Sequence, residues 1–146
     1  MLKQAIWHNF SLSINMMKYR YFLTLQLLLF FTLGTYAQGD VINDVRAALK
    51  AGSSKEVVKL LNKSTDLDFD GENSSYGKTQ AEAVLKDFFK KNPPTDFKII
   101  HQGASNAGAP YVIGQYSYKE GSFRVLIRLK EEGSLFRIHA MSFYKD

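Results

Sequence analysis

Two histidines are the residues of this chain best suited to proton transfer. His101 stands near the end of one expected strand, before Gln102 and Gly103, and His139 lies in a later one. An imidazole titrates near neutral pH, so it can act as a general base or bind a metal ion. The sequence has no cysteine and no third ligand at a metal-site spacing, so we expect no metal and no cofactor. His101 and His139 are therefore catalytic candidates, with hydrogen-bonded structural roles as the favoured alternative.

Acid–base enzymes commonly also use a carboxylate whose pKa has been shifted by burial. The long strands expected after residue 96 contain no Asp or Glu. Asp66, Asp68 and Asp70 alternate with apolar residues, so we expect all three to face water. Their spacing resembles the start of a calcium loop, but Gly77 stands where the twelfth-position glutamate belongs. The sequence therefore argues against an enzyme.

Arginines and tyrosines of the expected strands are candidates for ligand binding. Arg124, Arg128 and Arg137, with Tyr116 and Tyr118, are expected to form a basic, aromatic sheet face. Such a face suits an anionic ligand or an acidic partner, and a solvated sheet face is the alternative. The full set of expected ligand-binding residues is His101, Gln102, Tyr116, Tyr118, Arg124, Arg128, Arg137 and His139.

The N-terminal part has the order of a secretory signal. The basic residues Lys18 and Arg20 precede the uncharged run YFLTLQLLLFFTL at 21–33, and Ala37 follows it. The run is shorter than the roughly 20 residues of a membrane-spanning helix. We expect residues 16–37 to be a signal peptide cut after Ala37, residues 38–146 to be the domain, and the product to be secreted or periplasmic with no stable membrane anchor.

Residues 1–15 fit no part of a signal peptide. We expect them to be an over-extended start, with Met16 or Met17 rather than Met1 as the first residue, and a long native leader is the alternative.

Three of the 19 basic residues and none of the 14 acidic ones precede the cut, so the formal net charge falls from +5 to +2. This mild charge does not favour nucleic acid as a partner. A chain without cysteine has no disulfide and no lipoprotein-type anchor.

The hydrophobic periodicity predicts helices first and strands afterwards. Helical spacing covers 40–50, 54–61 and 78–91, with a strand at 65–70 and a short second strand near 75–76 before the third helix. Four strands follow at 97–102, 111–118, 122–130 and 134–144, joined by turns, which predicts an antiparallel meander. In the first of them Phe97, Ile99 and His101 share a face, and in the last His139 shares one with Met141.

This order resembles the nuclear transport factor 2-like superfamily. It is similar in particular to an uncharacterised group of small secreted proteins of Gram-negative bacteria. The resemblance depends on three stretches, DFFKKNPP at 87–94, HQG at 101–103 and GSFRV at 121–125. It implies an α+β fold with three N-terminal helices packed on a curved antiparallel sheet of four to six strands. Some superfamily members are dehydratases, isomerases or cyclases and others only bind, so the fold does not choose a function.

We therefore expect an exported, non-catalytic module that binds a small ligand or a protein through its sheet or pocket. A homodimer formed through the sheet is one arrangement that we consider. The alternatives are a small isomerase or hydrolase that uses a pocket histidine, and an accessory component of an envelope assembly.

Overall fold

The structure is a computed structural model that describes residues 36–146, with side chains from Val41 onward. The expected over-extended start and nearly all of the expected signal peptide lie outside these residues. Residues 37–146 form one compact unit. The described elements are α2 (Tyr36–Ala51), α3 (Ser54–Leu60), β1 (Leu61–Phe69), β2 (Glu72–Gly77), α4 (Lys78–Lys91), β3 (Pro94–Ala104), β4 (Pro110–Tyr118), β5 (Gly121–Glu132) and β6 (Leu135–Lys145).

The six strands form one sheet in the order β2-β1-β6-β5-β4-β3. The expected antiparallel meander is confirmed, since β3, β4, β5 and β6 pair with their sequence neighbours. The expectation of a wholly antiparallel sheet is wrong, because β1 pairs with β6 in parallel. Most of the domain separates these two strands in sequence, so no hairpin dictates their relative direction.

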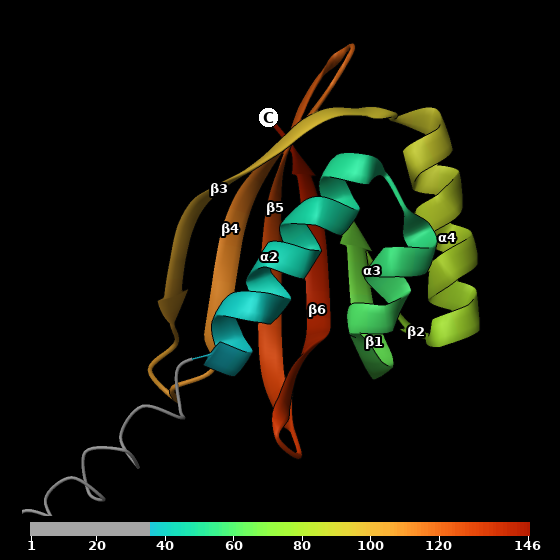
Figure 1. The fold of residues 1–146 in the computed structure, drawn as a ribbon. Coiled ribbons are helices and arrows are strands. Elements are labelled where there is room, and N and C mark those ends of the chain that lie inside the picture. Colours follow the sequence, from blue (N-terminus) through green and yellow to red (C-terminus); the bar gives the residue numbers. More distant parts are fainter. Residues whose placement is uncertain (1–35) are drawn as a thin grey trace, which may run out of the picture. The chain divides into compact units, whose positions relative to one another are not determined.

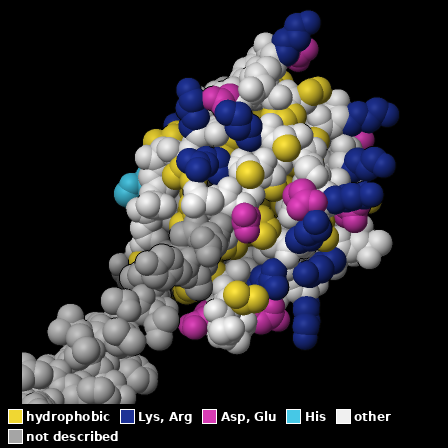
Figure 2. Space-filling view, viewed as in Figure 1, with side chains coloured by type: hydrophobic (Ala, Val, Ile, Leu, Met, Phe, Trp, Pro, Cys, Tyr) yellow, Lys and Arg dark blue, Asp and Glu magenta, His cyan; other side chains and the backbone are white. Residues whose placement is uncertain are grey.

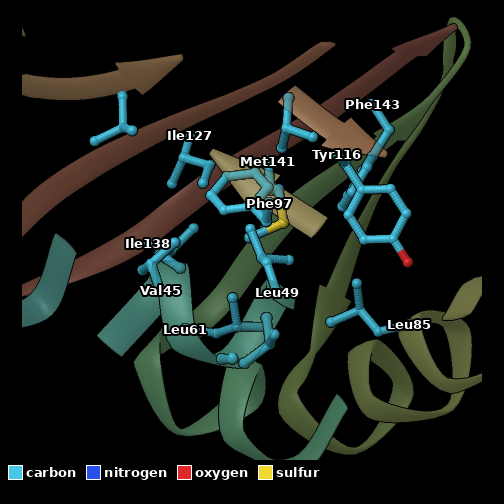
Figure 3. Packing of buried hydrophobic residues seen from close by; sticks show 14 of the residues in the cluster. Val45, Leu49, Leu61, Leu85, Phe97, Tyr116, Ile127, Ile138, Met141 and Phe143 are labelled. Carbon is cyan, nitrogen blue, oxygen red and sulfur yellow. The ribbon is translucent and has the colours of Figure 1, made fainter. Parts of the chain in front are cut away.

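The described helices lie over one face of the sheet (Figure 1). They bury an apolar core against that face; Val45 and Leu49 of α2 and Leu85 of α4 are directed towards strand residues such as Phe97 and Met141 (Figure 3). We call the opposite side of the sheet, which carries none of the described helices, the open face. Side chains alternate between the two faces along each strand.

An aromatic cluster fills the space between α4 and the sheet. Phe88 lies at its centre, on the helix. Its neighbours are Phe69, Phe89, Tyr116, Phe123 and Phe143, with ring centroids 4.6 to 5.8 Å away. Rings at such separations gain pair energy beyond their buried area. These rings occupy the space between Phe88 and the strands, and a hollow of about 370 Å³ remains beside them between α4 and β2, lined by Phe69, Tyr76 and Val84 among others.

The Lys-Asn-Pro-Pro stretch has a structural role at the end of α4. The backbone N–H and the side-chain amide of Asn92 both donate to the carbonyl of Phe88, at 2.9 and 3.1 Å. The hydroxyl of Tyr116 donates to the carbonyl of Asn92 at 2.6 Å. Pro94 packs beneath Gly52 in the α2–α3 turn, where an added Cβ would come within 2.9 Å of the proline ring. These contacts join the helix end, the turn and the sheet.

The helix-covered side carries mixed surface charge. Figure 2 shows Lys and Arg side chains along its α4 edge, interspersed with Asp and Glu. Ion pairs on these helices include Lys91–Asp87 within α4 at 2.8 Å and Lys59–Glu56 within α3 at 2.7 Å. Within residues 36–146, no helix combines the length and the hydropathy needed to cross a bilayer.

Candidate functional site

A β-bulge turns His101 onto the open face. Ile99 pairs with Gly114 and His101 pairs with Ile113, so Ile100 is an extra residue in β3. Gly114 is buried on the core face of β4, whereas Ile113 lies on the other face. The expectation that Ile99 and His101 share a face is therefore wrong. An inserted residue reverses the alternation beyond it.

A second bulge does the same for His139 in β6. Arg128 pairs with Ala140 and Leu129 pairs with Ile138, which leaves His139 as the extra residue. His139 lies beside Arg128 on the open face, while Met141 is fully buried in the core. The expectation that His139 shares a face with Met141 is therefore also wrong.

These two irregular strands frame a hollow of about 460 Å³ on the open face. Its floor comes from the sheet residues Leu126, Arg128 and His139. Ser105 and Ala109 of the β3–β4 connection, with Pro110 and Tyr111 at the start of β4, form its wall. Ligand sites commonly have volumes of about 300–1,000 Å³, so the hollow is large enough for a small molecule.

Hydrogen-bond donors converge on this hollow. Among the residues that the structure describes, Arg128 forms no ion pair. Ser105 Oγ accepts a bond of 3.2 Å from the N–H of Ala109, which leaves its own proton to donate. Nδ1 of His139 is buried without a partner.

The His-Gln-Gly stretch positions Tyr111 at the wall of the hollow. The Tyr111 hydroxyl lies 3.2 Å from Nε2 of His101. Gly103 is the cross-strand partner of Tyr111, and a Cβ there would lie 3.0 Å from that hydroxyl. Because Gly103 has no side chain, the Tyr111 ring can lie close to the backbone of β3. His101 is exposed and contacts Tyr111, which lines the hollow.

The expected basic, aromatic sheet face does not exist as such. Tyr116 and Tyr118 are buried on the core face of β4, and burial raises the pKa of the Tyr116 hydroxyl. Arg124 and Arg128 lie on the open face, because their β5 neighbours Val125 and Ile127 are fully buried in the core. Alternation therefore separates the tyrosines from the arginines.

Three further candidates lie away from the hollow. Arg124 pairs with Asp146 at 3.5 Å, near the end of the chain. Arg137 donates to the carbonyl of Lys59 at 2.7 Å and lines a separate hollow between α2 and α3. Gln102 is exposed on β3. Of the eight expected ligand-binding residues, the structure thus places Arg128 and His139 in the hollow and His101 beside it.

The aspartates at the end of β1 are bonded to protein groups. The expectation that all three face water is wrong for Asp68, which is 8% exposed. Asp68 accepts bonds from the Tyr144 hydroxyl at 3.2 Å and the Gly71 N–H at 2.8 Å. Asp66 accepts from the Ser75 hydroxyl, and Asp70 accepts from the N–H of Lys145 at 3.2 Å. These bonds fasten the β1–β2 turn to its neighbours.

Sequence reasoning missed Tyr111, Ser105 and Leu126. One usable signal was present for Tyr111, since a strand glycine such as Gly103 often has an aromatic ring packed over it from the partner strand. Ser105 and Leu126 carry no local signal, because only the curl of the β3–β4 connection and the register of β5 bring them together.

Comparison with solved structures gives the class of protein first. The chain is similar to a nuclear transport factor 2-like protein of unknown function from Shewanella baltica, with a TM-score of 0.58 and 12% identity over 77% of this chain and 97% of that chain. At this identity the likeness shows the fold alone, an α+β fold with a curved six-stranded sheet.

The family follows from the sequence match. Residues 42–143 match the domain of unknown function DUF4783, and the chain belongs to this family. It is similar to the crystal structure of a family member from Bacteroides ovatus, with a TM-score of 0.67 and 33% identity over 70% of this chain and 93% of that chain. A member from Bacteroides uniformis has the same TM-score at 28% identity, over 71% and 95% of the two chains. No match was found among curated proteins.

Proposed function

We propose that this protein is an exported, non-catalytic module that binds a ligand in the hollow on the open face. One observation carries the proposal. Aromatic rings of the protein pack closely against Phe88 on the helix-covered side, whereas Arg128, Ser105 and His139, whose buried Nδ1 has no partner among the described residues, meet on the open face. Ligand pockets typically combine an apolar lining with a few such polar groups.

The positions of the acidic groups favour binding over catalysis. General acid–base chemistry needs a carboxylate or an imidazole within hydrogen-bond reach of a sequestered substrate. Asp68, the buried carboxylate, is bonded to Tyr144 and Gly71 and contacts neither imidazole. His101 is exposed, and its described hydrogen bond goes to Tyr111. Neither histidine therefore has a partner that would activate it.

Export is the second part of the proposal. Its support is the signal-like order of residues 16–37, together with a family match that begins at Ile42. If the signal is cut after Ala37, the mature protein begins at Gln38. Expression of the full chain in a Gram-negative host, followed by fractionation and N-terminal sequencing, tests this. A full-length cytoplasmic product would contradict it.

Small molecules that copurify with the exported protein test the binding function. Purified protein is denatured, and the released molecules are identified by mass spectrometry for the wild type, Arg128→Gln and Arg124→Gln. The proposal expects a molecule present with the wild type and with Arg124→Gln but depleted with Arg128→Gln. Arg124 is the matched control, because it shares the strand and the face but pairs with Asp146 outside the hollow. Equal amounts in all three samples would contradict the proposal.

A further inference from the structure

We infer that the hollow on the open face takes a small organic monoanion, a carboxylate attached to a flat apolar body. This inference rests on the proposed function and names the ligand class for the same site. Charge, donor geometry and lining each contribute one part of it.

The charge of the hollow is positive and uncompensated. Arg128 is the charged residue of its lining, and among the side chains described from Val41 onward no acidic one lines it. On the same strand, Arg124 forms an ion pair with Asp146 at 3.5 Å. Arg124 is therefore paired with a carboxylate within the described residues, and Arg128 is not. A guanidinium presents a planar fork that matches a carboxylate in two parallel bonds. A carboxylate in the hollow would give Arg128 the partner that Arg124 already has.

The donors around Arg128 favour one negative charge rather than two. Ser105 offers its hydroxyl proton, and the imidazole of His139 lies in the same lining. Arg128 is the one Lys or Arg among the lining residues, so a single guanidinium charge faces the ligand. A phosphate monoester carries close to two negative charges at neutral pH. A single guanidinium therefore matches the charge of a carboxylate better than that of a phosphate.

The remaining lining suits an apolar body. Leu126, Pro110 and Ala109 present carbon atoms, and Tyr111 contributes its aromatic ring. The ring is held by the contact of its hydroxyl with His101 and by the space that Gly103 leaves. A ring fixed in this way offers a ready surface for a flat group, because little side-chain freedom is lost on binding.

Three related probes separate charge from shape. Phenylacetate carries one negative charge, phenylacetamide is its neutral counterpart, and phenyl phosphate carries the larger charge. Each is titrated into the protein while amide resonances of the hollow and of the sheet edge are followed by NMR. We expect phenylacetate to shift resonances around Leu126 and His139. Phenylacetamide should bind with an affinity at least about tenfold lower, because hydrogen bonds to charged groups are stronger than those between neutral groups.

Variants assign the charge effect to one residue. Arg128→Gln is expected to weaken phenylacetate binding by about tenfold or more and to leave phenylacetamide nearly unchanged, while Arg124→Gln leaves both unchanged. Circular dichroism checks that each variant folds. A second substitution in the hollow, Leu126→Ala, is expected to weaken both probes alike, because it removes apolar contact only.

The outcomes distinguish this inference from the proposed function. If phenylacetate and phenylacetamide bind the hollow equally, or phenyl phosphate binds it more tightly, the monoanion class is wrong while a binding hollow remains. Failure of phenylacetate to shift any resonance of the hollow at millimolar concentration also overturns the inference. The proposed binding function falls if the amount of the copurified molecule is independent of Arg128.

Discussion

The hydroxyl of Tyr116 donates a 2.6 Å hydrogen bond to the backbone carbonyl of Asn92, and so joins the middle of β4 to the end of α4. The tyrosine ring is also part of the aromatic cluster, 5.7 Å from Phe88 and 6.1 Å from Phe89. One side chain thus closes the interior and holds the proline-bounded end of the helix.

Replacement of Tyr116 by Phe removes this bond and keeps the ring. We expect the free energy of unfolding to fall by about 1–2 kcal/mol, because the Asn92 carbonyl loses a partner in a partly buried place. Urea denaturation at pH 7 measures the change. An unchanged midpoint would show that the bond does not stabilise the fold.

The same residue predicts a dependence on alkaline pH. Burial raises the pKa of the Tyr116 hydroxyl, so the folded protein keeps this proton to a higher pH than the unfolded chain. The contribution is complete below the unfolded pKa of about 10 and is lost progressively as the pH rises above it. Denaturation between pH 8 and pH 11 should show a steeper loss for the wild type than for Tyr116→Phe, and parallel curves would contradict this.

Truncation at the centre of the aromatic cluster should be strongly destabilising. Phe88→Ala removes a half-buried ring that packs against five others, so we expect a loss of about 2–3 kcal/mol, below the range of a fully buried Phe. Leu135→Ala is the control, since Leu135 is 51% exposed and should change stability by no more than about 0.5 kcal/mol. Chemical denaturation of both variants provides the comparison. A loss below 1 kcal/mol for Phe88→Ala would mean that the interior is not packed around this ring.

Alanine substitutions at two glycines with similar φ angles distinguish the cost of backbone strain from the cost of a steric clash. Gly52 has φ +62 and an added Cβ would lie 2.9 Å from the Pro94 ring, whereas Gly133 has φ +66 and open space around it. Gly133→Ala should cost about 1 kcal/mol for the left-handed conformation alone. Gly52→Ala should cost clearly more. Equal losses in thermal or urea unfolding would contradict the packing of Pro94 beneath the turn.

Gly103→Ala should disturb the hollow and leave the fold intact. The new Cβ would come within 3.0 Å of the Tyr111 hydroxyl, so the ring must move and its contact with His101 must change. We expect altered Tyr111 and His101 ring resonances and less copurified ligand, with the unfolding free energy lower by about 1 kcal/mol or less. Gly121→Ala, whose Cβ would have its nearest contact at 3.6 Å, is the matched strand control. An unchanged amount of copurified ligand would show that Gly103 does not position Tyr111 for binding.

Local patterns were sufficient to predict most of the fold. Helical spacing and the turns between strands predicted the three described helices and the β3–β6 meander, because both signals lie within a few residues of one another. The parallel pairing of β1 with β6 could not be predicted in this way, since it joins the two ends of the domain. It depends on how the helices and the meander pack together.

The candidate site was predicted less well for a physical reason. Strict alternation fails where one residue is inserted, and the bulges at Ile100 and His139 reverse the faces of the two histidines. The sequence pattern also placed Tyr116 with Arg128, although they lie on opposite faces of neighbouring strands. Only the pairing register, which is a long-range property, shows that Arg128, His139 and Tyr111 meet.

The most direct test of the proposed binding site is a crystal structure of the purified protein with its copurified molecule still bound. We expect electron density in the hollow on the open face, in contact with Arg128 and His139 and packed on Tyr111. Density between α4 and the sheet, among Phe69, Phe88 and Tyr76, would place the ligand in the interior and contradict the account.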